Sequence, residues 1–375
     1  MNILLVIGSL QSGGAERQMA AIAEGLAVRG HRVLLVTASP HADDIPCAAS
    51  VRRERLPCRR VPLGAVGRLL HRILVPFIAI LQARRLRKLV IEHKTDCAVG
   101  FLNVSNLVLI AATRGTGVPV IVSDRNNPWT YRVDSWVIRS LKRLLYPYAS
   151  LIVVQTDDLA AAYTGAYGVN TAIIPNCLVF VPPALSRPSR SIRALGRLIQ
   201  VKGHDVLIRA FAESGVWRSG WTLTIGGTGP ELTQLKLTAR RAGVDHVTRF
   251  AQAVSDPKDF LSEAGIFVLP SRSEGFPNVL LEAMACGCPS IATDCRSGPS
   301  ALIHSGSNGI LVPVDDVNAM AAAITTLVTD EQLRQILGGM AREVVDRYSK
   351  QRITDQWQEM IRTVIRQCSA RGVAP

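Results

Sequence analysis

The feature that most limits the fold of this chain is a regular alternation of short apolar segments with longer amphipathic ones. Each apolar run is too short for a stable helix, and a stretch with helical periodicity follows it. In the first half, the predicted strands are Ile3–Ile7, Arg32–Thr37, Cys97–Phe101, Val118–Ser123 and Leu151–Gln155. Alternating strands and helices form parallel sheets, because each helix returns the chain to the same edge of the sheet. The sequence therefore predicts an α/β fold of the doubly wound class.

The same alternation restarts after a segment rich in proline, serine and arginine at about residues 175–190, a composition typical of a linker. The later predicted strands are Ile192–Gly196, Thr222–Gly226, Gly265–Leu269 and Pro289–Thr293. A chain of 375 residues, 48% of them hydrophobic, is long enough for two cores. We predict two Rossmann-like domains that face a central cleft, over residues 1–175 and 176–350. A C-terminal helix within 351–375 is predicted to cross back to the first domain.

The segment after the strand Gly265–Leu269 carries the strongest candidate site, since ligands of such sheets bind beyond the carboxyl ends of the strands. Its candidate residues are Glu274, Gly275, Phe276, Pro277, Asn278 and Glu282. The amides of Gly275 to Asn278 lie at a predicted helix start, which favours a diphosphate. Glu274 can accept hydrogen bonds from sugar hydroxyls, and Glu282, further along the helix, from a ribose. The alternative is a solvated glutamate pair beside an ordinary helix.

Other candidate residues follow other predicted strands. Arg197 and Lys202 come after Ile192–Gly196, where two cations can neutralise a leaving diphosphate. Gly227 follows Thr222–Gly226, and Gly13 and Gly14 follow the first strand, so that the backbone can approach a ligand closely. Taken singly, these residues fit exposed surface cations and ordinary strand-to-helix turns equally well.

Together these motifs resemble the retaining GT-B glycosyltransferases of family 4, also called glycosyltransferase group 1, over nearly the whole chain. The matching segments are Ser12–Glu16, Gly196–Leu198 with Lys202–Gly203, Ile225–Glu231, the Glu-x7-Glu pair Glu274 and Glu282, and Asn308–Val312. The resemblance implies transfer of a sugar from a nucleotide diphosphate with retained anomeric configuration. It further implies that the departing phosphate helps to take the proton of the acceptor.

The loop after Val118–Ser123 departs from the pattern of this family. Many members carry a histidine near the position of Arg125, and this segment has none. In this respect the chain resembles the subgroup that extends polyprenyl-linked oligosaccharides with N-acetylhexosamines. Arg125 or Asp124 is expected to contact the sugar or the acceptor, and the alternative is a salt bridge within the loop.

Residues 67–93 form a predicted basic amphipathic helix, in which Pro76 is expected to kink or split the chain. Arg84, Arg87 and Lys88 share one side of it. With a net charge of +14, this segment favours an anionic membrane surface or the pyrophosphate of a polyprenyl-linked acceptor. The alternative is a domain helix with a solvated basic face. Motifs for nucleic-acid binding are not evident.

The eight cysteines form no CxxC pair, and neither metal-ligand spacing nor a DxD pair at the expected place is evident. We therefore expect reduced cysteines, a cytoplasmic location and a metal-independent enzyme without a cofactor. The apolar N-terminus is expected to be a strand rather than a signal peptide. The predicted protein is peripheral on the inner face of the membrane.

The predicted reaction moves a sugar, with N-acetylhexosamine favoured, from a UDP-sugar to a lipid-linked or saccharide acceptor in cell-surface glycan synthesis. UDP-GlcNAc, UDP-GalNAc, UDP-galactose, UDP-glucose and GDP-mannose stay open as donors. A nucleotide-sugar 2-epimerase shares the two-domain architecture, but it needs an acid/base set that the sequence does not show. A basic membrane-binding protein without catalysis is the third alternative, and it predicts no binding of a donor.

Overall fold

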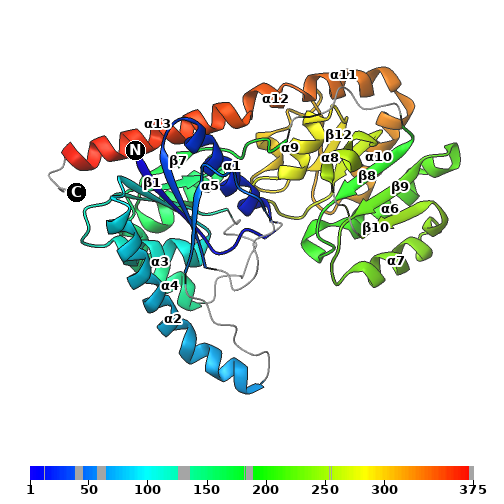
Figure 1. Cartoon of the computed structure of the whole chain (residues 1–375). Coiled ribbons are helices and arrows are strands. Elements are labelled where there is room, and N and C mark those ends of the chain that lie inside the picture. Colours follow the sequence, from blue (N-terminus) through cyan, green and yellow to red (C-terminus); the bar gives the residue numbers. More distant parts are fainter. Residues whose placement is uncertain are drawn as a thin grey trace. The chain divides into compact units, whose positions relative to one another are not determined.

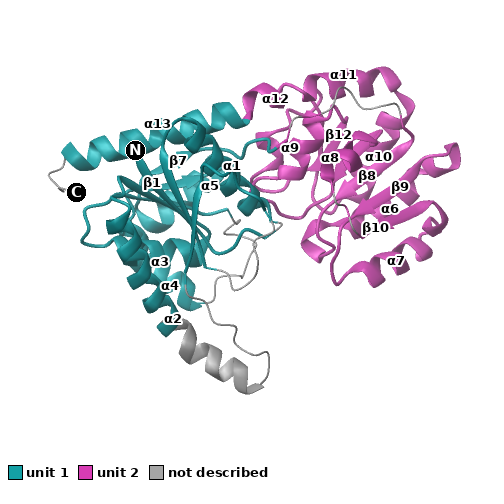
Figure 2. Cartoon of the chain, in the orientation of Figure 1, with its two compact units in different colours: residues 1–179, 350–375 teal, residues 180–349 magenta. Residues whose placement is uncertain are grey.

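The computed structural model of the chain describes residues 1–11, 13–38, 45–56, 65–125, 136–180, 182, 189–252, 254 and 256–370, with the backbone alone for residues 65–76. The chain forms two compact units (Figure 2). Unit 1 contains residues 1–179 and 350–375, and unit 2 contains residues 180–349. The division lies a few residues beyond the position 175 predicted from the sequence.

Unit 1 is built on a parallel sheet with the strand order β3-β2-β1-β4-β5-β6-β7 (Figure 1). Its strands are β1 (Asn2–Ile7), β2 (Arg32–Thr37), β3 (Arg52–Arg55), β4 (Cys97–Phe101), β5 (Val120–Ser123), β6 (Leu151–Val154) and β7 (Thr171–Ile173). Its helices are α1 (Gly14–Val28), α2 (Ala65–Glu92), α3 (Asn103–Thr113), α4 (Trp136–Leu145), α5 (Asp157–Tyr167) and α13 (Lys350–Ala370), with a short 3-10 turn at Tyr146–Tyr148.

Unit 2 repeats this plan with the strand order β10-β9-β8-β11-β12-β13, again with parallel pairing. Its strands are β8 (Ser191–Leu195), β9 (Thr222–Gly226), β10 (Thr248–Ala251), β11 (Ile266–Leu269), β12 (Ser290–Thr293) and β13 (Ile310–Val312). Its helices are α6 (His204–Ser214), α7 (Leu232–Arg241), α8 (Pro257–Ser262), α9 (Asn278–Ala285), α10 (Val317–Thr329), α11 (Glu331–Ala341) and α12 (Val344–Arg347), with 3-10 turns at Gln200–Lys202, Val216–Ser219, Asp245–Val247 and Pro299–Ala301.

The predicted α/β class and both doubly wound sheets are confirmed by this topology. The apolar pattern of the sequence does not predict the edge strands β3, β7 and β10, because they are short or carry charged side chains, as in Arg52–Arg55. The predicted split of the helix at Pro76 is wrong, since α2 runs from Ala65 to Glu92 as one element. A proline removes one backbone hydrogen bond, which a long helix tolerates.

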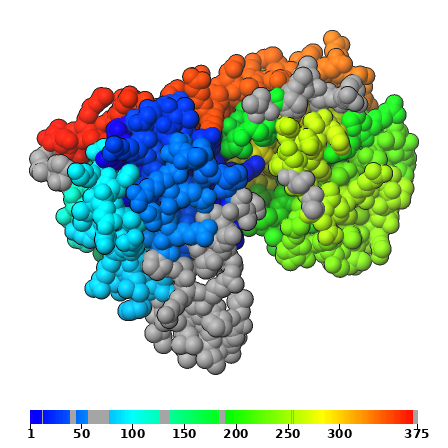
Figure 3. Space-filling view, viewed as in Figure 1, coloured from blue at the N-terminus to red at the C-terminus, as the bar shows by residue number. Residues whose placement is uncertain are grey.

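Helix α13 packs against α1 and completes the core of unit 1. Figure 3 shows it as the red C-terminal segment beside the blue N-terminal residues. Trp357 of α13 is fully buried, and its ring lies 5.7 Å from that of Phe101 at the end of β4. Arg29 donates hydrogen bonds to Asp355 at 2.6 and 2.8 Å, which fixes the helix at its N-terminal end. Helix α13 therefore contributes to the core of unit 1. Across the described residues, no helix has the length and apolar content needed to cross a bilayer.

Candidate active site

The strand order of unit 2 places two candidate loops side by side. The chain runs from β8 outward through β9 and β10, and then returns to the other side of β8 with β11. This reversal between β8 and β11 is the topological switch point, beyond which the loops of an open α/β sheet diverge and leave room for a ligand. The loop after β8 carries Arg197 and Lys202, and the loop after β11 carries Glu274.

Lys202 and Glu274 meet at this switch point. Lys202 Nζ donates to Glu274 Oε1 at 2.6 Å, and Ser271 Oγ donates to the same oxygen at 2.6 Å. The side chains of Lys202 and Glu274 are 20% and 9% exposed, so the ion pair is largely shielded from water. His204 lies beside the pair, and burial, reinforced by the positive charge of Lys202, lowers its pKa to about 4. It is therefore neutral near pH 7 and adds no charge to the site.

Arg272 holds the two loops in register. Its guanidinium donates to both carboxylate oxygens of Asp205 at 2.9 Å, and its backbone N–H donates to the carbonyl of Val201 at 2.8 Å. Its Nε also donates to Asp315 at 2.7 Å. The hydrogen bond with Asp205 is the main cause that raises the pKa of Arg272 above its usual value. Because these contacts join the loops after β8 and β11, they keep Lys202 close to Glu274.

The turn before α9 exposes backbone donors to a ligand. Helix α9 begins at Asn278, with Pro277 as its N-cap residue rather than its first helical residue. Within the described chain, the amides of Gly275, Phe276 and Val279 donate to no protein acceptor. The amide of Asn278 donates to the carbonyl of Phe276 at 3.0 Å, and proline has no N–H. Of the amides of Gly275 to Asn278 expected to bind a diphosphate, those of Gly275 and Phe276 are therefore available to a ligand, and the amide of Val279 is available as well.

The two remaining candidates of the Glu-x7-Glu segment are buried. The ring of Phe276 packs against Tyr348 with a centroid distance of 5.9 Å, which anchors the turn to the end of unit 2. Glu282 in α9 is 3% exposed, so its carboxylate is not on a solvated face of the helix. The alternative of two solvated glutamates is therefore wrong for this pair, since both Glu274 and Glu282 are buried.

The loop after β9 lies directly against the loop after β8. Gly227 has φ +133°, and a Cβ atom built on it would lie 1.9 Å from the carbonyl oxygen of Gly196. The amide of Gly196 donates to the carbonyl of Gly226 at 3.0 Å, and that of Leu198 to Thr228 at 2.8 Å. Only glycine fits at position 227, because any side chain would push the two loops apart. Arg197 is exposed in the loop next to it.

Replacing Gly227 by alanine is expected to lower the free energy of unfolding by about 3 kcal/mol or more, through backbone strain and the clash with Gly196. The matched control is Gly165→Ala in α5, where a Cβ atom meets nothing within 4 Å and φ is helical. That change is expected to stabilise the protein by about 0.5–1 kcal/mol. Denaturant unfolding of both variants measures the difference, and equal stability would contradict the close approach of the loops.

In unit 1, the glycine loop follows β1, next to the corresponding switch point between β1 and β4. Gly14 begins α1, and Gly13 is its N-cap residue with an extended backbone. A Cβ atom on Gly13 would lie 2.0 Å from a carboxylate oxygen of Glu16, which folds back over the loop. The absence of a side chain at Gly13 therefore leaves space for Glu16, and burial raises the pKa of this carboxyl group.

Asp124, at the end of β5, belongs to a buried network rather than to an open loop. Lys142 of α4 lies 2.9 Å from its carboxylate, and the two side chains are 4% and 0% exposed. Tyr146 Oη and Asn106 Nδ2 each donate to the same carboxylate at 2.9 Å. Asp124 therefore pairs with Lys142 of α4, outside the loop, and not within the loop as the alternative expected. The carboxylate of Asp124 is therefore already bonded to protein groups.

The neighbouring Arg125 has a different environment. Its guanidinium lies over the ring of Phe101 at 4.2 Å and near that of Trp357 at 6.0 Å. Its Nη1 donates to Asn176 Oδ1, which lies just after β7. Burial lowers the pKa of Arg125 to about 9, and it remains protonated near pH 7. No carboxylate of the described chain forms an ion pair with it.

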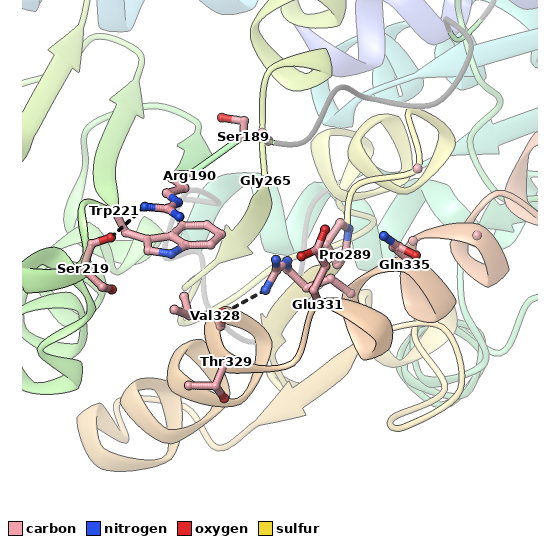
Figure 4. Close-up of a pocket in the computed structure, with 15 residues that line it drawn as sticks. Ser189, Arg190, Ser219, Trp221, Gly265, Pro289, Val328, Thr329, Glu331 and Gln335 are labelled. Carbon is pink, nitrogen blue, oxygen red and sulfur yellow. Dashed lines mark hydrogen bonds between the residues drawn. The ribbon is translucent and has the colours of Figure 1, made fainter.

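A cavity of about 850 Å³ in unit 2 lies away from these residues (Figure 4). Its lining residues precede the strands: Arg190 comes before β8, Trp221 before β9, Gly265 before β11 and Pro289 before β12. The cavity therefore lies at the amino edge of the sheet, whereas Lys202 and Glu274 lie at the carboxyl edge. Ligands of this fold class bind at the carboxyl edge, so we assign the candidate site there.

Lys202, Glu274 and Arg125 were predicted from the sequence, and the structure adds the residues that bind their side chains. Arg272 and Asn176 were missed because their partners are distant in the sequence. A polar residue shortly after a strand, as Asn176 follows β7 (Thr171–Ile173), is the signal that would have identified it. Within the described residues, no group of three or more His, Cys, Asp or Glu side chains is placed to hold a metal ion.

Comparison with known proteins agrees with this architecture. Residues 13–177 match the glycosyl transferase 4-like domain, and residues 186–344 match the glycosyl transferases group 1 domain. A Campylobacter jejuni enzyme named N-acetylgalactosamine-N,N'-diacetylbacillosaminyl-diphospho-undecaprenol 4-alpha-N-acetylgalactosaminyltransferase is 26% identical over 363 residues, 93% of this chain and 96% of that protein. A second enzyme of that organism, which is named as an alpha-1,4-N-acetyl-D-galactosaminyltransferase of a PP-undecaprenol-linked saccharide, is 25% identical over 97% of this chain and 99% of its own.

Among solved structures, Anabaena HepE in complex with UDP superimposes with a TM-score of 0.78 at 20% identity, covering 97% of this chain and 100% of that one. This likeness establishes the fold, and the two matched domains together span most of the sequence. The chain therefore joins a glycosyl transferase 4-like domain to a glycosyl transferases group 1 domain, and it is a glycosyltransferase of the GT-B fold.

Proposed function

We propose that this enzyme transfers an N-acetylhexosamine from a UDP-sugar to a polyprenyl-diphosphate-linked saccharide, with retention of the anomeric configuration. The observation that carries the donor part is the cluster at the switch point of unit 2. There Lys202, Glu274 and the unpaired amides of Gly275 and Phe276 lie on adjoining loops. A cation and backbone amides suit a diphosphate, and a carboxylate suits sugar hydroxyls.

In the ligand-free protein, Lys202 and Glu274 neutralise each other. A bound diphosphate competes for Lys202, because it carries more negative charge than a single carboxylate. Glu274, still held by Ser271 Oγ, is then left to accept hydrogen bonds from the sugar. Positive charge from Lys202 and the amides stabilises the charge that develops on the leaving diphosphate. The proposal therefore needs no metal ion for this step.

The acceptor part rests on the relatives. Both Campylobacter enzymes are named for undecaprenol-linked saccharides, and both match this chain over nearly its whole length. They are named as N-acetylgalactosaminyltransferases, which favours UDP-GalNAc among the candidate donors. The neighbour HepE holds UDP on the same fold, which favours uridine as the base.

The test is turnover with purified protein. UDP release is followed with UDP-GalNAc, UDP-GlcNAc, UDP-galactose, UDP-glucose and GDP-mannose, each with and without a polyprenyl-diphosphate-linked saccharide, in EDTA and in Mg²⁺. We expect acceptor-dependent release of UDP from an N-acetylhexosamine donor at similar rates in EDTA and Mg²⁺, and NMR of the product should show the donor's anomeric configuration. Interconversion of free UDP-sugars without an acceptor would instead favour the epimerase, and binding of no donor at all would exclude the transferase.

We further propose that unit 1 lies on the anionic cytoplasmic face of a membrane. Helix α3 packs against both α2 and α4, which lie together in Figure 1. Exposed apolar side chains occur on both outer helices, with Phe77 of α2 59% exposed and Trp136 and Leu144 of α4 74% and 63% exposed. Arg139 and Arg143 lie on α4 among them. Apolar side chains flanked by arginines suit a peripheral contact with anionic lipid.

Replacing Trp136 and Leu144 together by serine is expected to weaken binding to anionic vesicles tenfold or more, since burial of each side chain contributes about 1.5–3 kcal/mol. Co-sedimentation with phosphatidylglycerol-containing vesicles, compared with pure phosphatidylcholine, measures this. The control is Ile336→Ser, which removes a 52% exposed apolar side chain from α11 in unit 2. Unchanged binding of the double variant would show that α4 does not meet the membrane.

A further inference from the structure

The most unusual buried group of unit 1 is the guanidinium of Arg125. Its Nε and Nη2 atoms are shielded from solvent, and neither has a hydrogen-bond partner among the described residues. Only Nη1 is bonded, to Asn176. A buried donor without an acceptor is costly, and a buried charge without a counter-ion is more so. Such a group persists where it serves a function that the surrounding fold enforces.

The two unpaired nitrogen atoms of Arg125 lie on the same edge of its guanidinium group. Nε and Nη2 form the side-on edge of a guanidinium, whose parallel N–H bonds match two oxygens of one phosphate or carboxylate. The guanidinium carbon lies over the ring of Phe101 at 4.2 Å and 6.0 Å from the ring of Trp357. The protein therefore fixes the plane of Arg125 and leaves the bidentate edge unused.

The neighbouring residues show that this fold can neutralise a buried cation. One residue earlier, Asp124 pairs with Lys142 at 2.9 Å, and both side chains are buried. Among the described residues, Arg125 has no such partner. Its position directly after β5 places it at the carboxyl edge of the sheet, where the ligands of this fold bind.

We propose that the Nε–Nη2 edge of Arg125 binds a phosphoryl oxyanion of a substrate. This site rests on the proposed function, because a nucleotide diphosphate donor and a lipid diphosphate acceptor both present such oxygens. Asn176 orients the guanidinium through Nη1, and the rings of Phe101 and Trp357 hold its plane. Arg125 is thus a specificity-determining residue, which selects a substrate that carries a diphosphate.

The test compares the wild-type protein with Arg125→Met and Arg125→Lys by equilibrium binding of UDP and, separately, of farnesyl diphosphate. We expect the Kd of one ligand or both to rise at least tenfold in R125M. R125K keeps the positive charge but not the paired N–H groups of the guanidinium, so it should recover only part of the lost affinity. The ligand whose Kd changes identifies the source of the oxyanion. The matched control is Arg114→Met, which removes an exposed arginine stacked on Tyr148 at 4.1 Å.

The stability of the ligand-free variants separates this site from a structural role. Because methionine removes an unpaired buried charge, the Tm of R125M without ligand should equal or exceed that of the wild type. A lower Tm with unchanged Kd values would overturn the proposal, as would a wild-type protein that binds neither ligand. Binding is measured without turnover, so failure of sugar transfer in the donor screen would be seen separately.

Discussion

Replacing Glu274 by glutamine is expected to lower kcat/KM for sugar transfer by about 10²–10³-fold, the range seen when one charge-stabilising group is removed from an active site. Glutamine has nearly the same shape, so the turn before α9 should keep its fold. The substitution removes the negative charge of the carboxylate, to which Lys202 Nζ and Ser271 Oγ each donate a hydrogen bond at 2.6 Å. Steady-state kinetics with the preferred UDP-sugar measures the effect.

The position of Glu274 predicts whether the substitution weakens the binding of UDP or the transfer of the sugar. If the carboxylate contacts the sugar, the Kd for UDP alone should change much less than kcat/KM for the UDP-sugar. The control is Glu263→Gln, which neutralises a carboxylate of unit 2 that is 68% exposed and paired with Arg193. A kcat/KM of E274Q within threefold of the wild type would contradict the assignment. An equal loss of UDP binding would move Glu274 from the sugar to the phosphates.

Replacing Lys142 by methionine is expected to lower the free energy of unfolding by about 3–5 kcal/mol, because it leaves Asp124 charged and unpaired in the core of unit 1. Asp124 is fully buried, and only Tyr146 and Asn106 would continue to donate to it. Chemical denaturation with urea measures the change. The surface control is Arg143→Met, an exposed residue of the same helix, with an expected change within about 0.5 kcal/mol.

The double variant Lys142→Met/Asp124→Asn tests the origin of this loss. Asparagine can still accept from Tyr146 and Asn106 but carries no charge, so the pair becomes neutral. We expect the double variant to be more stable than K142M alone by about 2 kcal/mol or more, which is a coupling typical of residues in direct contact. Additive losses in the two single variants would mean that packing, rather than charge, holds this position.

The sequence predicted the sheets because their signal is local. Apolar runs such as Arg32–Thr37 and Cys97–Phe101 coincide with strands β2 and β4, since strands buried on both faces have few polar residues. The short edge strands were not predicted, because Arg52–Arg55 and Thr171–Ile173 lack such an apolar run. Their pairing depends on a neighbouring strand rather than on their own composition.

For the proposed donor site, the sequence by itself determined which residues follow β8 and β11 and what chemistry they offer. Position after a strand is enough for that, because parallel strands bring their carboxyl ends to one edge. Only the tertiary structure decided that Lys202 meets Glu274, that Arg272 joins their loops, and that the free amides are those of Gly275, Phe276 and Val279.

The same division holds in unit 1. The sequence singled out Arg125 by the absence of a histidine, yet it left Asp124 and Arg125 as equal candidates. The structure separated them, because Lys142 of α4 neutralises Asp124, whereas the rings of Phe101 and Trp357 lie near Arg125 without neutralising it. These partners come from distant parts of the chain, and which buried charge stays unpaired depends on three-dimensional packing. Local sequence fixes the chemical type of each side chain, and only the fold decides whether its charge is already satisfied.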